Sequence, residues 1–401
     1  MSDMETREVK LGNIVKHNKG YAFKSSEYTD EGVMVVRVTD FTLDSISDAD
    51  AVYLAPDDRY DKFILKTNDI LIQTVGSWAN NPNSIVGKVV RVPKQCDNAY
   101  LNQNIVRIIP NNDLDNTYLF YALKANHFST YCVLRGQGAA NQASITLDTI
   151  FRFKFKAHNF TAQQRIAGIL SAYDNLIENN NKRIHLLEQM AENLYKEWFV
   201  RFRFPGYEDV DFENGIPNGW KIERLSDIAD IIMGQSPESE NYNTNCEGLP
   251  FHQGVGSYGE FYLIDDVYST KGNRIAEANS IIFSVRAPVG RINITLNKII
   301  LGRGVAAINS AKGYNAYLLW MLKNQFQQED IIGNGSIFAS VTKKELFGFK
   351  ILMPNEDLIQ KFDSIASGIE REMRKISLIN SNLKKQRDML LPRLMSGKLE
   401  V

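Results

Sequence analysis

Residues 161–199 read TAQQRIAGILSAYDNLIENNNKRIHLLEQMAENLYKEWF, and residues 357–391 read DLIQKFDSIASGIEREMRKISLINSNLKKQRDMLL. In both stretches one stripe of mostly apolar positions recurs at alternating steps of four and three residues, the heptad pattern of a coiled coil. The stripe of the first stretch is Ile166, Leu170, Tyr173, Ile177, Asn180, Ile184, Leu187, Ala191, Leu194 and Trp198. That of the second is Phe362, Ala366, Ile369, Met373, Ile376, Asn380, Leu383, Arg387 and Leu390. Each stripe needs a partner, so we expect two long helices that pair.

The ends of these helices carry local signals. Thr161 and Asp357 are each followed three residues later by glutamine, the spacing of a capping box, and we expect the helices to begin there. We expect Pro205 and Gly206 to end the first helix and the second to end near Pro392. The alternative is a single amphipathic helix packed on each domain.

An antiparallel pairing fixes a register. If Asn180 lies opposite Asn380, Trp198 lies opposite Phe362 and Tyr173 opposite Arg387, because the residue numbers of facing positions then have one sum. A buried amide without a partner costs ~1–3 kcal/mol, so a slip by one heptad is disfavoured. In the alternative, both asparagines face solvent or a bound subunit.

The rest of the chain repeats around these helices. Four blocks of the first half recur in the same order in the second: LGNI (11–14) as LSDI (225–228), NDILI (68–72) as NSIIF (279–283), YLFYALK (118–124) as YLLWMLK (317–323), and ASIT (143–146) as ASVT (339–342). Each copy has short β-branched runs, one helical run and then a long helix. We therefore expect an α+β fold with two duplicated domains, at residues 1–158 and 205–354, and helical segments at residues 159–204 and 355–401.

Composition agrees with a globular chain of two or three domains. It has 401 residues, of which 44% are hydrophobic and 23% charged, with a formal net charge of −1. The N-terminal MSDMETREVK is polar and acidic, so we expect no signal or transit peptide. The cysteines, Cys96, Cys132 and Cys246, are odd in number and far apart, which favours a reducing cytoplasm. A chain that held nucleic acid by bulk charge would be basic, so any positive field must be local.

The sequence lacks the motifs that would indicate an enzyme. The chain has no GxxxxGK[ST] phosphate loop, no Asn/Asp-Pro-Pro-aromatic motif of adenine methyltransferases, and no nuclease motif outside its first residues. Its five histidines lack metal-ligand spacing. GVGSYG at 254–259 matches GxGxxG, but a strand-like run follows it where a dinucleotide site needs a helix. We expect no catalytic residue, metal or cofactor in this chain.

Several motifs resemble one family. These are QMAENLYKEWF (189–199), RFPGY (203–207), GIPNGW (215–220), GQSP (234–237) and LLPRLMSGKL (390–399). Together with the duplication, they make the chain similar to the specificity subunits of type I restriction-modification enzymes over essentially its whole length. The first half lacks a counterpart of GIPNGW, which leaves the edge of its domain open.

The resemblance implies a non-catalytic, DNA-binding subunit. Two target-recognition domains would each read one half of a split double-stranded DNA site, with the antiparallel helices as a spacer. Two modification (methyltransferase) subunits, which bind S-adenosylmethionine and methylate adenine, and restriction motor-nuclease subunits would join it. The first helix, about 39 residues, would span roughly 58 Å at ~1.5 Å per residue. That is more than one ~34–36 Å turn of duplex.

Candidate DNA-binding residues lie in polar loops at matching places of the two halves. In the first half they are Lys19, Tyr21, Lys24, Gln73, Thr74, Ser77, Trp78, Asn80, Asn81, Arg135, Gln137, Asn141 and Gln142. In the second they are Gln235, Ser236, Ser239, Arg274, Ser284, Arg286, Arg291, Arg303, Asn334, Ser336 and Phe338. Amide and guanidinium groups can bond base edges in pairs, and residues 271–304 hold six basic side chains against one acid, Glu277. Solvated charges and tight structural turns are the alternative reading.

Two other functions stay open. One is the recognition subunit of a related system whose partner fuses nuclease and methyltransferase. The other, from a different class, is a coiled-coil scaffold with two protein-binding domains.

Overall fold

The chain forms two compact units in a computed structural model that describes residues 6–42, 45–78, 84–125, 127–139, 142–331 and 340–401. Unit 1 comprises Met1–Glu178 and Asn380–Val401, and unit 2 comprises Asn179–Ile379. Each long helix is thus shared between both units. The predicted domains 1–158 and 205–354 fall in different units, and their detailed bounds stay a prediction.

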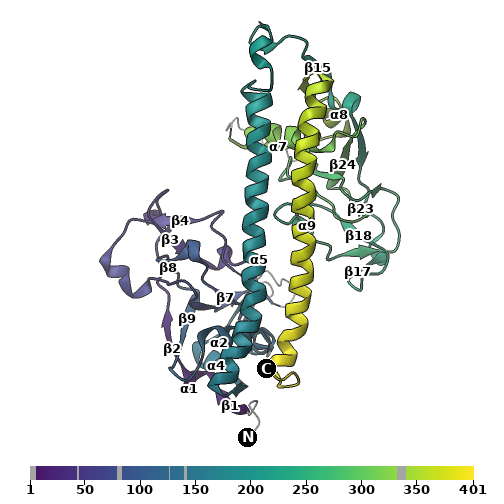
Figure 1. The fold of residues 1–401 in the computed structure, drawn as a ribbon. Coiled ribbons are helices and arrows are strands. Elements are labelled where there is room, and N and C mark those ends of the chain that lie inside the picture. The colour runs from purple at the N-terminus through teal and green to yellow at the C-terminus, as the bar shows by residue number, and fades with distance from the viewer. Residues whose placement is uncertain (1–5, 43–44, 79–83, 126, 140–141, 332–339) are drawn as a thin grey trace. The chain divides into compact units, whose positions relative to one another are not determined.

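The two long helices are present, α5 (Phe160–Tyr195) and α9 (Glu356–Met395), and α5 continues into a π-helical turn, η6 (Lys196–Val200) (Figure 1). Within unit 2 the ring centroids of Trp198 and Phe362 lie 5.9 Å apart, so this predicted pair is confirmed. Within unit 1, Nη1 of Arg387 lies 2.6 Å from Oδ1 of Asp174, one residue from the expected partner Tyr173. In unit 1, Ile177 contacts Asn380 and Asp174 contacts Arg387, and in unit 2, Arg183 contacts Glu372 and Trp198 contacts Phe362. Within each unit the helices therefore run in opposite directions, and the predicted antiparallel pair is confirmed.

The two stripe asparagines are both buried, Asn180 at 9% and Asn380 at 5% exposed. Nδ2 of Asn380 donates to the carbonyl oxygen of Ile177 at 3.4 Å. The pairing of Asn180 with Asn380 joins residues of different units and stays a prediction.

The predicted helix ends need correction. Helix α5 begins at Phe160, and Oδ1 of Asn159 accepts the Ala162 N–H at 2.9 Å, so Asn159 takes the capping position expected for Thr161. Helix α9 begins one residue before Asp357 and runs through Pro392 to Met395. A proline so near the end removes one backbone hydrogen bond, and the last turn is held by burial of Leu394 and Met395.

The described residues of unit 1 form four small sheets. The largest is antiparallel, in the order β2 (Val15–Lys19), β9 (Ile105–Pro110), β5 (Ile70–Gln73) and β7 (Val89–Arg91). The second has the order β4 (Val52–Leu54), β3 (Val33–Val36) and β8 (Tyr100–Leu101), in which β3 and β8 are parallel. The other two are β10 (Gln137–Ala139), β11 (Gln142–Ser144) and β6 (Val75–Gly76), and the pair β1 (Thr6–Lys10) and β12 (Lys154–His158). Its short helices are α1 (Leu11–Ile14), α2 (Asn116–Ala125), α3 (Phe128–Arg135) and α4 (Leu147–Phe151).

Unit 2 repeats much of this plan. One sheet has the order β16 (Ala229–Met233), β24 (Val305–Ser310), β21 (Ile281–Ser284) and β22 (Ile292–Ile294). Another has the order β17 (Tyr242–Asn243), β19 (Tyr268–Ser269), β18 (Leu249–His252), β23 (Ile299–Leu301) and β20 (Ile275–Ala276), in which β18 and β23 are parallel. Two strand pairs complete the described part of the unit, β15 (Lys221–Arg224) with β25 (Lys350–Met353) and β13 (Phe212–Glu213) with β14 (Ile216–Pro217). Its helices are α6 (Leu225–Ile228), α7 (Asn315–Ile331) and α8 (Lys343–Phe347). The predicted α+β class with two duplicated domains is confirmed.

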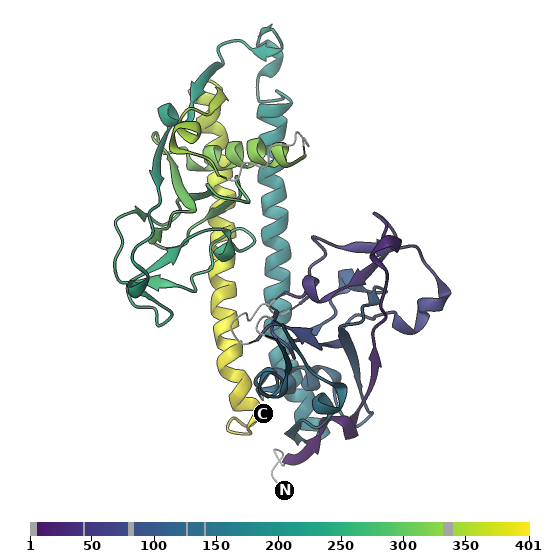
Figure 2. The same cartoon turned by 180° about the vertical axis from the view of Figure 1, so that it is seen from behind.

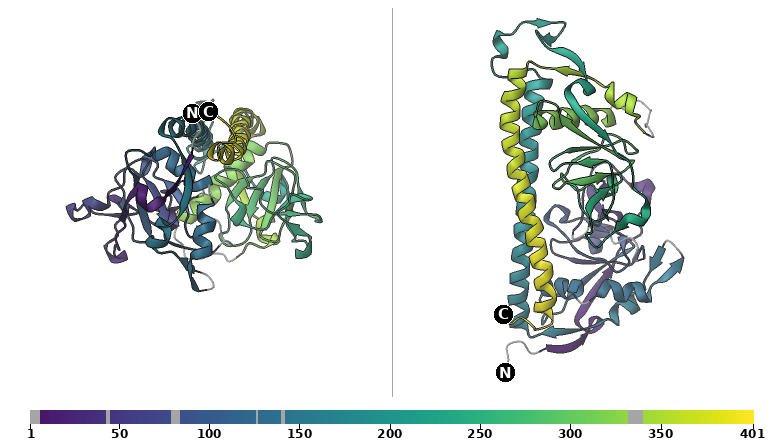
Figure 3. Two further views of the ribbon diagram at one scale, coloured as in Figure 1. Left: turned by 90° about the horizontal axis from the view of Figure 1, so that it is seen from below. Right: turned by 90° about the vertical axis from the view of Figure 1, so that its right-hand side faces the viewer.

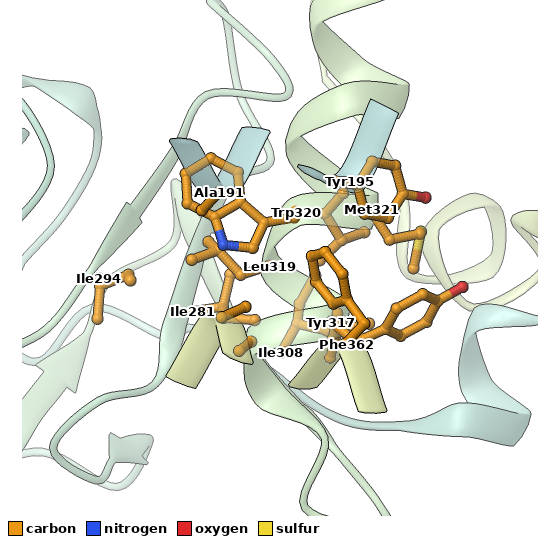
Figure 4. Close-up of a cluster of buried hydrophobic side chains, with 14 of the residues drawn as sticks. Ala191, Tyr195, Ile281, Ile294, Ile308, Tyr317, Leu319, Trp320, Met321 and Phe362 are labelled. Atoms are coloured by element: carbon orange, nitrogen blue, oxygen red, sulfur yellow. The ribbon is translucent and has the colours of Figure 1, made fainter. Parts of the chain in front are cut away.

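The core of unit 2 lies where α7 packs across the long helices (Figure 2). The ring of Tyr317 on α7 lies 6.1 Å from that of Tyr195 on α5 and 6.2 Å from that of Phe362 on α9. Trp320, from the same helix, joins Ile281 and Ile308 of the sheet to this cluster (Figure 4). The four-stranded sheet of unit 2 therefore lies on one side of α7 and the helix pair on the other (Figure 3).

Candidate nucleic-acid interface

Five segments of unit 1 meet where its central strands end. We call them strand-end cluster 1, consisting of residues 20–21, 36–37, 74–75, 102–105 and 144–145. Four backbone hydrogen bonds join them: Gly20 N to Ile105 O (3.1 Å), Asn102 N to Val36 O (3.2 Å), Thr74 N to Asn104 O (2.9 Å) and Ile145 N to Thr74 O (2.9 Å). Two more complete the arrangement: Tyr21 N donates to Leu101 O just before the turn (2.9 Å), and Ile105 N donates to Asn102 O within it (3.2 Å). The centre of the cluster is the four-residue turn 102–105.

Unit 2 contains the same arrangement in strand-end cluster 2, consisting of residues 234–235, 252–253, 285–286, 302–305 and 340–341. The equivalent bonds are Gly234 N to Val305 O (3.0 Å), Gln235 N to Leu301 O (2.9 Å), Gly302 N to His252 O (2.8 Å), Val305 N to Gly302 O (3.2 Å), Val285 N to Gly304 O (2.9 Å) and Val341 N to Val285 O (2.8 Å). The duplication seen in the sequence therefore extends to individual hydrogen bonds. It also aligns turn 102–105 with turn 302–305.

Close approach of backbones explains a glycine in each cluster. A Cβ built on Gly20 would lie 1.9 Å from the carbonyl oxygen of Asn102, and one on Gly234 would lie 2.0 Å from that of Gly302. Neither distance can be relieved by a side-chain rotation, because the atom that is met is main chain. Glycine is therefore required where the segment leaving β2 or β16 crosses the central turn.

Two loops that the sequence presented as separate are joined in the structure. Strand β10 pairs antiparallel with β11, and β11 pairs with β6, which follows β5 after one residue. In unit 2 an isolated bridge joins Arg286 to Ser340 at the equivalent register. Nε1 of Trp78 donates to the carbonyl oxygen of Ala139 at 3.0 Å, which fastens β10 to the segment after β6.

Three predicted contact residues are buried, and their side chains hydrogen-bond to the main chain of the cluster or of nearby turns. Nε2 of Gln73 donates to the carbonyl oxygens of Val75 (2.9 Å) and Ser84 (3.1 Å). Oγ1 of Thr74 donates to Asn104 O at 2.9 Å, and Oγ of Ser284 donates to Pro288 O at 2.7 Å. Polar groups at the ends of buried strands satisfy the main chain of the turns that follow, so these side chains are not presented at the surface.

The other described candidates are exposed or half-buried. Exposed in unit 1 are Lys19, Tyr21, Lys24, Arg135, Gln137 and Gln142, and exposed in unit 2 are Gln235, Ser239, Arg274, Arg286, Arg291 and Arg303. Ser77, Trp78 and Ser236 are half-buried. Asn80, Asn81, Asn141, Asn334, Ser336 and Phe338 lie outside the described residues.

Several polar side chains of the clusters were missed from the sequence, including Gln103, Arg37 and Gln253. Gln103 is exposed in the central turn of unit 1, at the position of Arg303 in unit 2. Arg37 and the exposed Gln253 follow the equivalent strands β3 and β18. Continuing the sequence alignment through IVRIIP (105–110) and VAAINS (305–310) would have paired Gln103 with Arg303.

Polar contacts hold the segments that follow β3 and β18. Nη2 of Arg37 lies 2.8 Å from Oδ1 of the buried Asp40, whose hydrogen bond raises the pKa of the guanidinium. His252 is buried, with Nδ1 2.7 Å from Oγ of Ser257 and Nε2 2.9 Å from Oδ1 of Asp265. The first contact therefore holds Arg37 of cluster 1 in place, and the second holds the loop after β18 through the buried His252.

The clusters themselves carry no carboxylate, since none of their segments contains Asp or Glu. Of the basic side chains around cluster 2, Lys298 pairs with Glu277 at 2.7 Å. The part of the chain that the structure describes contains no group of three or more His, Cys, Asp or Glu side chains suited to a metal ion. Among its described helices, none is long and apolar enough to cross a bilayer.

Comparison with known proteins identifies the family. Residues 1–189 and 217–386 match the family model for the type I restriction modification DNA specificity domain. The chain is 31% identical over 352 residues to a protein assigned as the MjaX type I specificity subunit of Methanocaldococcus jannaschii, covering 85% of this chain and 80% of that one. It is 27% identical over 316 residues to the MjaIX specificity subunit of the same organism, covering 75% and 73%. It shares its fold with the type I S subunit from M. genitalium, at a TM-score of 0.56 and 16% identity over 98% of this chain and 96% of that one. With two copies of the domain and a match over most of its length, the chain belongs to the family of type I restriction-modification DNA specificity subunits.

Proposed function

We propose that this chain selects the DNA sequence on which a type I restriction-modification enzyme acts, with each unit reading one half of a split site. The observation that carries the proposal is the pair of strand-end clusters. The same six backbone hydrogen bonds hold equivalent turns in both units, while the exposed side chains of the turns differ. The same main-chain arrangement with different exposed side chains in each unit suits the reading of two different half-sites.

The exposed side chains have the chemistry that base and phosphate recognition needs. Glutamine and arginine can each make paired hydrogen bonds with base edges in the major groove. The clusters lack carboxylates, so phosphates meet no fixed negative charge within them. With a net charge of only −1, the chain needs partner subunits to supply further phosphate contacts.

We propose that modification and restriction subunits dock on the long helices. Apolar side chains are exposed on both: Ile169, Leu176 and Met389 in unit 1, and Leu186, Met190, Ile365, Leu378 and Ile379 in unit 2. Exposed apolar side chains that recur along a helix favour burial against another protein. Two modification subunits, one for each unit, would match the duplication.

We assign the bond chemistry to those partners. Methyl transfer from S-adenosylmethionine and cleavage would take place on the modification and restriction subunits, and the present chain would contribute sequence choice. This function places it in the cytoplasm, with the DNA on which it acts. The purified chain alone should neither methylate nor cut DNA.

The experiment is to express the chain with its modification subunits in a host that lacks adenine methylation, and to map methylated adenines across the genome. The expected result is a single motif of two specific parts separated by an unread gap. The matched control omits this chain and should leave no such motif. Absence of sequence-specific methylation, together with no binding of the complex to duplex DNA, would favour the coiled-coil scaffold instead.

A further inference from the structure

The central turn of each strand-end cluster is held by its neighbours on several sides. In unit 2, Gly302 N donates to His252 O, the carbonyl oxygen of Gly304 accepts from Val285 N, and Arg303 N donates to Oγ of Ser236 at 3.1 Å. In unit 1, the carbonyl oxygen of Asn104 accepts from both N and Oγ1 of Thr74. The main chain of both turns is therefore fixed by direct bonds.

Steric contacts hold the turn of unit 2 as closely. A Cβ on Gly302 would lie 2.8 Å from Cα of Gln253, and one on Gly304 would lie 2.2 Å from the carbonyl oxygen of Gln253. Only the residue between these glycines, Arg303, can carry a side chain at the tip of the turn, and it is exposed. In unit 1 the equivalent tip residue, Gln103, is also exposed.

The two tips thus combine a fixed main chain with a variable side chain. Readout by paired hydrogen bonds needs this combination, because the donor groups must be held at a set distance and angle to the base edge. Around the tips, Arg37 is bound by Asp40, whereas Tyr21, Gln235 and Gln253 are exposed. Each tip residue is therefore flanked by side chains that can lie along the DNA beside it.

We propose that Gln103 and Arg303 are equivalent specificity-determining residues, one in each half-site. An amide makes paired bonds with N6 and N7 of adenine, and a guanidinium makes them with O6 and N7 of guanine. Gln103 reads an adenine in the half-site of unit 1, and Arg303 reads a guanine in the half-site of unit 2. The inference rests on the proposed function and adds the residue and the base to it.

The test exchanges the two side chains and maps methylated adenines in cells that carry the modification subunits. Arg303→Gln should lower methylation of the original site about 5- to 150-fold, which is the discrimination that one paired contact provides. The motif should change at one guanine of one half-site, and the other half-site should be unaltered. Gln103→Arg should change one adenine of the opposite half-site in the same way.

Matched controls separate this effect from a change of charge. Arg224 and Gln95 are exposed and lie outside both clusters, so Arg224→Gln and Gln95→Arg should keep the original motif. Arg303→Lys keeps the charge but loses the planar fork, so it should also relax the choice at the guanine. A thermal unfolding midpoint equal to that of the parent would establish that each variant folds.

Two outcomes would overturn the inference. One is an unchanged motif and extent of methylation in both exchanged variants. The other is an equal loss on all sequences with a smaller dependence of binding on salt, which marks a phosphate contact. Failure of the proposed function would look different, because the parent protein itself would then give no split motif.

Discussion

At the scale of single residues, the recognition surface depends on residues small enough for its closely packed main chain and on residues whose side chains face outward. Gly20 belongs to the first kind, since any Cβ there meets the main chain of Asn102. Arg286 and Arg291 belong to the second, being exposed beside the turn that follows β21. The two kinds lead to different expectations for substitution.

Gly20→Ala should displace the central turn of unit 1. We expect a loss of stability on the order of 1–3 kcal/mol, the cost of forcing extra carbon into a packed site, and loss of recognition of one half-site. Gly168→Ala is the control, because a Cβ at Gly168 on helix α5 meets nothing within 4 Å and alanine favours helix. Denaturant unfolding and methylation mapping measure both effects. Equal stability of Gly20→Ala and the parent would contradict the assigned packing.

Arg286→Ala and Arg291→Ala should each weaken binding of the assembled complex to its DNA site, by ~1–3 kcal/mol if the arginine makes a paired base contact. A base contact should also relax sequence choice, whereas a phosphate contact should reduce the salt dependence. Titrations of specific and unrelated duplexes at several salt concentrations distinguish the two. If neither variant alters affinity or selectivity, these arginines lie outside the interface.

At the scale of elements, helix α9 contains a carboxyl group whose ionisation opposes folding. Burial, with the nearby charge of Asp363, raises the pKa of Glu370 from 4.5 to about 8. Among the described residues, its Oε1 is buried without a hydrogen-bond partner. Between these two pKa values the folded state retains a proton that the unfolded state releases, so stability should fall as pH rises through this window.

Glu370→Gln should remove this dependence. Its free energy of unfolding should exceed that of the parent by an amount that grows toward about pH 8, by at most about 1.4 kcal/mol per pH unit. Urea unfolding at a series of pH values provides the measurement, with Glu372→Gln, a half-buried position on the same helix that pairs with Arg183, as the control. A constant difference between Glu370→Gln and the parent across the window would mean that Glu370 does not titrate as described.

The coiled-coil register gives a second prediction at this scale. Cysteines at Asn180 and Asn380, in a chain in which the exposed Cys246 is replaced by serine, should form a disulfide on oxidation. Asn181→Cys with Asn380→Cys, which moves one cysteine off the stripe, should crosslink more slowly. Faster crosslinking of Leu187→Cys with Asn380→Cys would indicate a register displaced by one heptad.

The helices were predictable because their signal is local and repeated. A heptad stripe predicts which face of a helix is buried. Together with the duplication it also predicts which residues of the two helices lie opposite one another, as Trp198 and Phe362 do. The helix start was missed by a few residues because Asn159 and Thr161 have similar capping chemistry. Which of the two caps the helix depends on where the preceding strand ends.

The recognition surface was only partly predictable. The pairing of β11 with β6 joins segments far apart in the chain through strands of two or three residues, which leave no periodic pattern. Gln73, Thr74 and Ser284 look like contact residues in a polar loop, but these side chains are buried and donate to main-chain carbonyl groups. Gln103 lies in a stretch with no distinctive composition, and only alignment of the two repeats reveals its equivalence to Arg303.

At the scale of the whole molecule, two copies of one frame on a shared pair of helices imply two independent readers. The equivalent hydrogen bonds of the clusters lie within unit 1 or within unit 2. A change within one cluster should therefore leave the other intact. Each half of the DNA site should therefore be read independently of the other.

The direct test exchanges residues 205–354 for the matching segment of a relative with a different target and maps methylated adenines in the host. We expect a hybrid motif in which one half is that of the relative and the other half is unchanged. Exchange of residues 1–158 should give the reciprocal hybrid. If replacing one segment altered both halves of the motif together, the two units would not read DNA independently.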